Sequence, residues 1–136
     1  MKTSNGVCST GIDIVYIPRL VKYINDEAFL DRLLTDVERE YIFTKKIPYK
    51  HLAGRFAAKE AVMKALGTGW DKGIGWRDIE VINTPDGRPA VRLHSKAKDI
   101  VQSKNIFLSI SYAKDIAVAC AVLEGANELS HSNPCL

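Results

Sequence analysis

Long hydrophobic runs are missing from this sequence, and so are the common glycine-rich signatures of nucleotide binding. No apolar stretch approaches the roughly 20 residues that a helix needs to cross a bilayer, so we expect no membrane partner. Neither the phosphate-binding pattern G-x-x-x-x-G-K-S/T nor the dinucleotide pattern G-x-G-x-x-G occurs. A nucleotide-like ligand would therefore have to be held by some other arrangement.

Cysteine, histidine and net charge are also sparse. An odd number of cysteines without metal-ligand spacing, together with no signal sequence, predicts a reducing compartment, the cytoplasm. The histidines His51, His94 and His131 have no partner at ligand spacing, and we interpret them as surface residues. A formal net charge of +3 is too small to indicate nucleic acid, but it suits a small polyanion or an acidic protein.

Length and composition are those of an ordinary globular domain. The chain has 136 residues, of which 46% are hydrophobic and 26% charged, so it can bury a core without a disulfide or a structural metal. We predict one domain over residues 1–125 and a flexible polar tail over residues 126–136.

The expected secondary structure predicts an α+β fold. A T-x-x-E capping box at residues 35–38 marks one helix start, and Pro48 and Gly67 mark the ends of the longest helix. Gly11 inside the first strand suggests a bend or a close backbone approach. The expected elements are a strand over 7–17, helices over 18–34, 35–45 and 49–66, hairpin strands over 78–83 and 89–93, a helix over 95–102, and strands over 106–112 and 116–123. This order predicts a small antiparallel sheet packed on helices.

The densest chemical signal is the segment GRFAAKEAVMKALGTG at residues 54–69. Its alanines favour a helix, on which Glu60 and Lys64 are four residues apart and share one face. The carboxylate of Glu60 has apolar neighbours, among which it is poorly solvated without a cation or hydrogen bonds. A plain surface pair of Glu60 with Lys64 is the structural alternative.

A second carboxylate, Asp13, interrupts the apolar segment GIDIV at residues 11–15. Aspartate is disfavoured in strands, and the structural alternatives are an edge position facing water or a cap on a neighbouring helix. Taken together, Asp13 and Glu60 on two rigid elements are the kind of ligands that Mg²⁺ takes when it also holds phosphate oxygens. Lys64 and Arg55 would then supply cations for phosphates.

Two other segments could line a phosphate or nucleotide site. The segment Gly67-Thr68-Gly69 could offer backbone N–H groups, although an ordinary glycine C-cap explains it equally well. The segment SISYAKD at residues 109–115 places small hydroxyls beside an aromatic ring and a lysine. Polar hairpin ends often carry such residues, so this second signal is weak alone.

The order of these motifs resembles that of holo-[acyl-carrier-protein] synthase, the small bacterial class of phosphopantetheinyl transferases. The matching segments are GIDIV, GRFAAKEAVMKALGTG, DIEV with GRP after it, and SISYAKD. The resemblance covers residues 11–123, nearly the whole expected domain. It implies a phosphopantetheinyl transferase fold of β-α-α-α-β-β type and a homotrimer with active sites at the subunit interfaces.

The resemblance also implies a reaction. A serine hydroxyl of apo acyl carrier protein attacks the β-phosphate of coenzyme A. The 4'-phosphopantetheine arm is transferred and adenosine 3',5'-bisphosphate leaves, in support of fatty acid biosynthesis. Asp13 and Glu60 would hold Mg²⁺, or Mn²⁺ in its place, with Lys64 near the reacting phosphate. These three residues are the expected catalytic set, and Glu60 or a metal-bound water would accept the proton.

A wider set of residues is implied in coenzyme A binding. It comprises Arg55, Lys64, Gly67, Thr68, Pro89, Ser111 and Tyr112. The chain departs from the family at Tyr112, where histidine is common. A phenol carries no positive charge near neutral pH, so Lys114 or Arg55 would have to hold a coenzyme phosphate instead.

The carrier-protein surface is expected on the basic start of the helix over residues 18–34. Arg19 and Lys22 lie close in sequence to Asp13 and would steer an acidic carrier, whereas a solvated helix face is the structural alternative. Two other functions fit the same motifs. One is a transferase that primes a polyketide or peptide synthase carrier, and the other is a catalytically silent coenzyme A-binding homologue.

Overall fold

The computed structural model describes residues 6–67 and 73–125, in an α+β arrangement. Its elements are β1 (Val7–Tyr16), η1 (Ile17–Tyr23), α1 (Glu27–Leu33), α2 (Asp36–Phe43), α3 (Pro48–Leu66), η3 (Trp76–Asp78), β2 (Ile79–Asn83), β3 (Pro89–Leu93), α4 (Ser95–Val101), β4 (Asn105–Ala113) and β5 (Ile116–Glu124). The predicted fold class is confirmed. The predicted tail over residues 126–136 lies outside the described residues.

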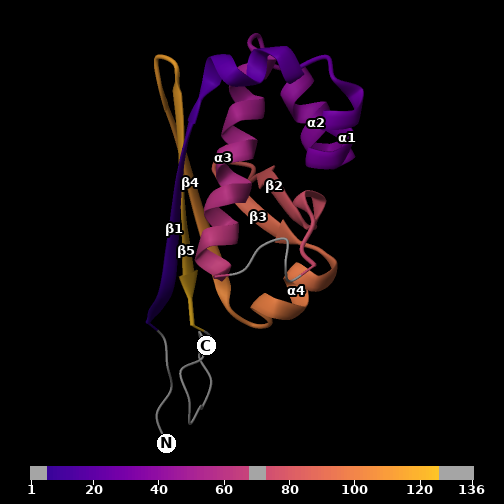
Figure 1. Cartoon of the computed structure of the whole chain (residues 1–136). Helices are drawn as coiled ribbons and strands as arrows, with labels where there is room; N and C mark the ends of the chain where they lie inside the picture. Colours follow the sequence, from indigo (N-terminus) through magenta and orange to yellow (C-terminus); the bar gives the residue numbers. More distant parts are fainter. Residues whose placement is uncertain (1–5, 68–72, 126–136) are drawn as a thin grey trace, which may run out of the picture.

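A three-stranded antiparallel sheet in the order β1-β5-β4 forms one layer, and α3 lies along one of its faces (Figure 1). Strands β2 and β3 pair with each other as a separate hairpin. This hairpin contacts α3 through β2 and the sheet through β3 and β4. Helix α3 is therefore the central element, packed against the sheet, the hairpin and α2.

Small residues let the sheet and α3 approach each other closely. The inward positions of β5 alternate as Ala117, Ala119, Ala121 and Leu123, and all four are buried. At Gly11 on β1, an added Cβ would lie 1.9 Å from the carbonyl oxygen of Ala61. The close backbone approach predicted at Gly11 is thus confirmed, and no larger residue fits there without moving the strand or the helix.

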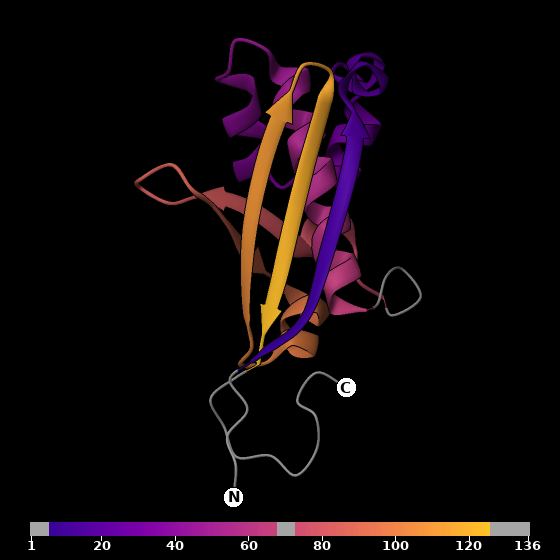
Figure 2. The same ribbon diagram turned by 90° about the vertical axis from the view of Figure 1, so that its left-hand side faces the viewer.

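The opposite face of this sheet is apolar and is covered by no described element (Figure 2). We call it the outer sheet face. It comprises Thr10, Ile12, Ile14, Tyr16, Phe107, Ser109, Ser111, Ala113, Ile116, Val118, Cys120 and Val122, which the strand register places side by side. Ile12 and Ile14 are 63% and 66% exposed, although isoleucine normally favours burial.

The predicted continuous helix over residues 18–34 is wrong. The chain instead makes the 3₁₀ segment η1 and then breaks before α1. The cause is Asp26, whose backbone is extended and whose side chain accepts a hydrogen bond from the Phe29 N–H at 3.0 Å. An aspartate side chain satisfies the free N–H groups of a new helix start, so it favours a break over continuation.

Other helix boundaries follow the predicted signals. The capping box is present, with Thr35 accepting from the Glu38 N–H and Glu38 accepting from the Thr35 N–H. Helix α3 begins at Pro48 and ends at Gly67, which adopts the left-handed conformation with φ of 67°. These signals act within a few residues, which explains why sequence alone located them.

Cys120 has a free thiol on the outer sheet face. Among the described helices, none combines the length and the apolar character needed to cross a bilayer. The cytoplasmic location stays a prediction.

A buried ion pair fixes α3 to its neighbours, and it was missed in the sequence. Lys59 and Glu38 are fully buried, with 2.8 Å between Nζ and Oε1. Lys59 also donates to the carbonyl oxygens of Trp76 at 2.9 Å and Ile79 at 2.7 Å. The second oxygen of Glu38 accepts from the Val81 N–H at 2.8 Å. This network joins α3, α2, η3 and β2, and it satisfies both charges.

Candidate functional site

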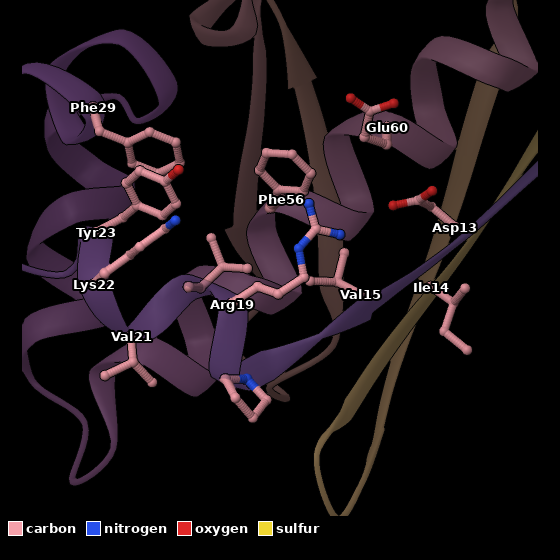
Figure 3. Close-up of a pocket in the computed structure, with 12 residues that line it drawn as sticks. Asp13, Ile14, Val15, Arg19, Val21, Lys22, Tyr23, Phe29, Phe56 and Glu60 are labelled. Atoms are coloured by element: carbon pink, nitrogen blue, oxygen red, sulfur yellow. The ribbon is translucent and has the colours of Figure 1, made fainter.

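Two carboxylates predicted as partners do come together. Asp13 of β1 and Glu60 of α3 lie near each other where the strand contacts the helix, and both line one pocket (Figure 3). Burial raises the pKa of Glu60, and the nearby charge of Asp13 raises it further. The Nζ of Lys64 lies 3.2 Å from Oδ1 of Asp13, and the positive charge of Lys64 acts in the opposite direction, lowering the pKa of Glu60. The arrangement holds two negative charges against one cation.

Local backbone contacts position this acidic pair. Gly11 brings β1 against α3 at Ala61, the residue after Glu60. Two residues further along the strand, Asp13 points in the same direction, because side chains alternate along a strand. Lys64 donates to the Ile12 carbonyl oxygen at 2.9 Å and so ties helix to strand beside the pair.

The donor set fits a hard divalent cation such as Mg²⁺. Carboxylate oxygens are its preferred protein ligands, and it commonly uses one or two of them and leaves its other positions to water and phosphate. Among the described residues, no group of three or more His, Cys, Asp or Glu side chains could hold a metal. A cation bound by Asp13 and Glu60 would therefore keep most of its positions open.

A largely apolar pocket of about 760 Å³ opens beside the acidic pair. Stacked rings of Tyr23 and Phe29, with centroids 4.3 Å apart, form one side, and Phe56 forms another. The predicted basic residues Arg19 and Lys22 both line this pocket (Figure 3). The pocket combines a carboxylate end, an apolar wall and a basic rim.

A second pocket lies around Arg55, and its cation is almost completely buried. The side chain of Arg55 donates to Asn83 Oδ1 at 2.7 Å, and its guanidinium lies 4.1 Å from the centre of the Tyr41 ring. Its Nε has no hydrogen-bond partner. Burial lowers the pKa of Arg55, because a charge away from water is less stable. A buried donor without a partner marks a position where an anionic group would bind.

Tyr112 and Pro89 line this second pocket, as does His51. The Tyr112 hydroxyl lies where a Cβ on Gly54 would be, 2.0 Å away, so the missing side chain of Gly54 makes room for the phenol. Our interpretation of His51 as a surface residue is wrong. It is half-buried, with its ring edge-on to those of Tyr41 and Tyr112.

The two pockets lie on different faces of α3, which the sequence analysis did not foresee. Arg55 and Glu60 are five residues apart, and this places them roughly 140° apart around the helix axis. Consistently, no residue that lines the pocket of the acidic pair also lines the Arg55 pocket. Ser111 points to the outer sheet face, away from Tyr112. Within one chain, the residues that we expected in a single site therefore lie in separate places.

The remaining predicted residues are placed as follows. Gly67 caps α3 and has open space where a Cβ would be, so its left-handed φ alone explains the glycine. Thr68 lies outside the described residues. His94, interpreted as a surface residue, has a side chain that is 44% exposed, and its Nε2 lies 3.1 Å from Glu80 Oε1. His131 lies outside the described residues.

Sequence reasoning missed three polar residues of the Arg55 pocket: Tyr41, His51 and Asn83. The buried spacing of α3 could have indicated Arg55 and Lys59 as inward residues, because Leu52, Arg55, Lys59 and Val62 recur every three or four positions. No comparable sequence pattern indicates Asn83. This residue lies at the end of β2, far from Arg55 in the sequence, and the two come into contact only when the chain folds.

Comparisons with known proteins find a family match over most of the chain. The family model of the 4'-phosphopantetheinyl transferase superfamily matches residues 9–121. A holo-[acyl-carrier-protein] synthase of Geobacter sp. (strain M21) is 42% identical over 123 residues, 87% of this chain and 98% of the relative.

Solved structures show the same fold. That of a holo-(acyl-carrier-protein) synthase from Bacillus anthracis, in complex with CoA (3',5'-ADP), has a TM-score of 0.74 and 38% identity over 88% of this chain and 97% of that one. A Helicobacter pylori holo-[acyl-carrier-protein] synthase in complex with coenzyme A has a TM-score of 0.74 and 33% identity, covering 84% and 98% of the two chains.

The matched segment contains the functional groups of both pockets. Asp13 and Glu60 of the acidic pair lie within it, as do Arg55 and Tyr112. A match over most of the chain, together with relatives above 40% identity, establishes common descent rather than a shared motif. The chain therefore belongs to the 4'-phosphopantetheinyl transferase superfamily.

Proposed function

We propose that this chain transfers 4'-phosphopantetheine from coenzyme A to a serine of apo acyl carrier protein, releases adenosine 3',5'-bisphosphate and so supports fatty acid biosynthesis. The observation that carries the proposal is the meeting of Asp13 and Glu60 at one end of a large pocket. The curated relatives bear the name holo-[acyl-carrier-protein] synthase, and two solved relatives are complexes with coenzyme A or 3',5'-ADP.

The chemistry assigns a role to each group of the acidic pair. Asp13 and Glu60 would hold Mg²⁺, with Mn²⁺ as an alternative, and the bound cation would neutralise pyrophosphate charge and polarise the reacting phosphorus. Lys64 stands beside the pair and can balance negative charge on a phosphate. The carboxylate of Glu60 is also the group proposed to accept the serine proton.

Coenzyme A would extend from the acidic pair to the Arg55 pocket of another copy of the chain. Arg55, Pro89 and Tyr112 supply the cation and the walls of that pocket, Lys64 lies beside the acidic pair, and Ser111 lies on the outer sheet face. Because the halves lie on different faces of one chain, a head-to-tail contact is needed to unite them. Such contacts close into rings, and we propose a homotrimer.

The outer sheet face is the proposed contact between copies. Replacing Ile12 by aspartate is expected to yield a folded monomer, because the charge would lie in an interface between apolar sheet faces. Val37→Asp is the matched control, since Val37 is also exposed, at 51%, but lies on α2. Sedimentation equilibrium measures the mass of each variant. A trimer of unchanged stability with Ile12→Asp would contradict the proposed interface.

Arg19 and Lys22 are proposed to receive the acidic carrier protein at the pocket rim. Charge reversal by Arg19→Glu is expected to raise KM for the carrier about tenfold, because like charges slow the encounter of the two proteins. The KM for coenzyme A should stay the same. Arg92→Glu serves as a control on β3, outside both pockets. An unchanged carrier KM would exclude Arg19 from this surface.

The function itself is tested by mass spectrometry. Apo carrier protein incubated with the chain, coenzyme A and Mg²⁺ should gain the mass of one phosphopantetheine. Gain with the carrier domain of a polyketide or peptide synthase, and none with a fatty acid carrier, would favour the other type of transferase. No gain with any carrier would leave the catalytically silent coenzyme A-binding homologue as the better hypothesis.

A further inference from the structure

The Arg55 pocket gathers positive charge without a neutralising carboxylate. Lys45 lies 4.5 Å from the centre of the Tyr41 ring, and Lys50 lies 4.8 Å from that of Tyr112. Among the described residues, neither these lysines nor Arg55 forms an ion pair. The acid whose charge acts on Arg55 is Glu38, and its carboxylate is already bound by Lys59.

Such a pocket favours an anion with several charges. The guanidinium of Arg55 is held in place by Asn83 and Tyr41, and its Nε lacks a partner. A phosphate group would offer acceptor oxygens to buried and surface cations together, and charge-assisted hydrogen bonds of this kind are the strong ones. Pockets lined by one sign of charge also concentrate oppositely charged ligands.

His51 is the titratable group at the centre of this charge. It precedes Arg55 by one helical turn, so both side chains share one face of α3 and line the same pocket. Its ring centroid is 6.0 Å from that of Tyr41 and 5.9 Å from that of Tyr112. Burial, and then the charges of Arg55, Lys45 and Lys50, lower the pKa of His51 to about 4.

The neutral state of His51 therefore depends on the pocket holding no anion. Near pH 7 the free imidazole is uncharged and can donate one hydrogen bond from one ring nitrogen. A phosphate in the pocket would offset the three cations that repel a proton on the ring, and it would accept a hydrogen bond from the imidazolium. Both effects favour the protonated ring once the anion is bound.

We propose that His51 is a binding residue for the phosphate-bearing nucleotide end of coenzyme A, and that the ring takes up a proton when this anion enters the pocket. The inference rests on the proposed function. It adds His51 to the residues that bind coenzyme A, and it adds the uptake of one proton to the binding step. Uptake of a proton makes binding stronger as the pH falls. The gain is at most tenfold per pH unit, between the pKa of the free ring and that of the bound ring.

Calorimetric titration with adenosine 3',5'-bisphosphate tests the proposal directly. Titrations at pH 6 in two buffers of different ionisation heat give the number of protons bound with the ligand. The wild-type chain is expected to take up more protons than His51→Phe, by a difference approaching about one, since one imidazole titrates. Phenylalanine keeps a ring between the two tyrosines, and the protons of the ligand itself cancel in the difference.

A matched control and a direct probe complete the experiment. His94→Gln, which removes a histidine outside the pocket and keeps a hydrogen-bonding group beside Glu80, should behave like the wild type. In NMR spectra, the His51 ring signal, assigned by its loss in His51→Phe, should show a higher pKa with ligand than without it.

The outcomes separate the two proposals. Binding with equal proton uptake by wild type and His51→Phe, or a ring pKa that the ligand leaves unchanged, would overturn the role of His51 and leave the proposed function standing. No binding of adenosine 3',5'-bisphosphate by the wild type at any pH would overturn both.

Discussion

Replacing Glu60 by glutamine is expected to lower kcat/KM for phosphopantetheine transfer by about three orders of magnitude, which corresponds to roughly 4 kcal/mol in the transition state. Glutamine keeps the size of the side chain and removes its charge and its capacity to accept a proton. The acidic pair then has one carboxylate left, Asp13, and that one is already partnered by Lys64 at 3.2 Å. The assay follows the mass of the carrier protein over time.

Glu40→Gln, an exposed carboxylate change on α2, should leave the rate unaltered. A second readout separates metal binding from chemistry. Binding of Mn²⁺, followed by its electron paramagnetic resonance signal, should weaken in Glu60→Gln whether or not substrate turns over. Full activity in Glu60→Gln would exclude the acidic pair as the catalytic centre.

The proposed site between two chains can be tested further with the same variant. Glu60→Gln inactivates the acidic half, and Arg55→Gln is expected to impair the other half, on a different face of α3. In mixed trimers, roughly a quarter of the sites, half of one type times half of the other, would receive both intact halves. Recovery of activity on mixing supports an interfacial site. No recovery in mixed trimers would indicate that each chain carries a complete site.

Replacing Lys59 by methionine is expected to lower the free energy of unfolding by about 3–5 kcal/mol, because it leaves Glu38 charged and buried without its cation. The same change frees the carbonyl oxygens of Trp76 and Ile79, which accept from Lys59. Urea unfolding, followed by circular dichroism, measures the loss. Lys64→Met on the same helix is the control, since Lys64 is 53% exposed and its ion pair should contribute about 1 kcal/mol or less.

A double variant separates the effect of the ion pair on stability from the effect of packing at Lys59. Lys59→Met with Glu38→Gln removes both charges together, so its loss should be smaller than the sum of the two single losses. Additive losses would indicate that packing at Lys59, and not the ion pair, accounts for the effect. Equal losses for Lys59→Met and Lys64→Met would contradict the importance of burial.

Local signals explain which parts of the fold could be predicted from sequence. The capping box at Thr35 and the proline and glycine at the ends of α3 act within one turn, so their outcome hardly depends on distant residues. Gly11 also predicted a close approach correctly, since a glycine among β-branched residues has few other uses. Asp13 and Glu60 could also be singled out from the sequence, because a carboxylate stands out among apolar neighbours.

The errors arise where distant residues decide. The break within residues 18–34 is the exception, because the overlooked signal is local: Asp26 caps a new helix start. The position of Arg55 depends on what covers each face of α3, which the helix pattern alone does not reveal. No nearby residue indicates the ion pair of Lys59, because its carboxylate partner Glu38 is 21 residues away.

The contact of β1 with α3 at Gly11 also determines how tolerant this site is to change. There the main chain of the strand meets the main chain of the helix, with no side chain of Gly11 between them. Main-chain atoms have no rotamers, so the spacing between Asp13 and Glu60 is set by the least adjustable part of the protein. Substitutions deeper in the core can therefore lower stability while the spacing of the carboxylates persists.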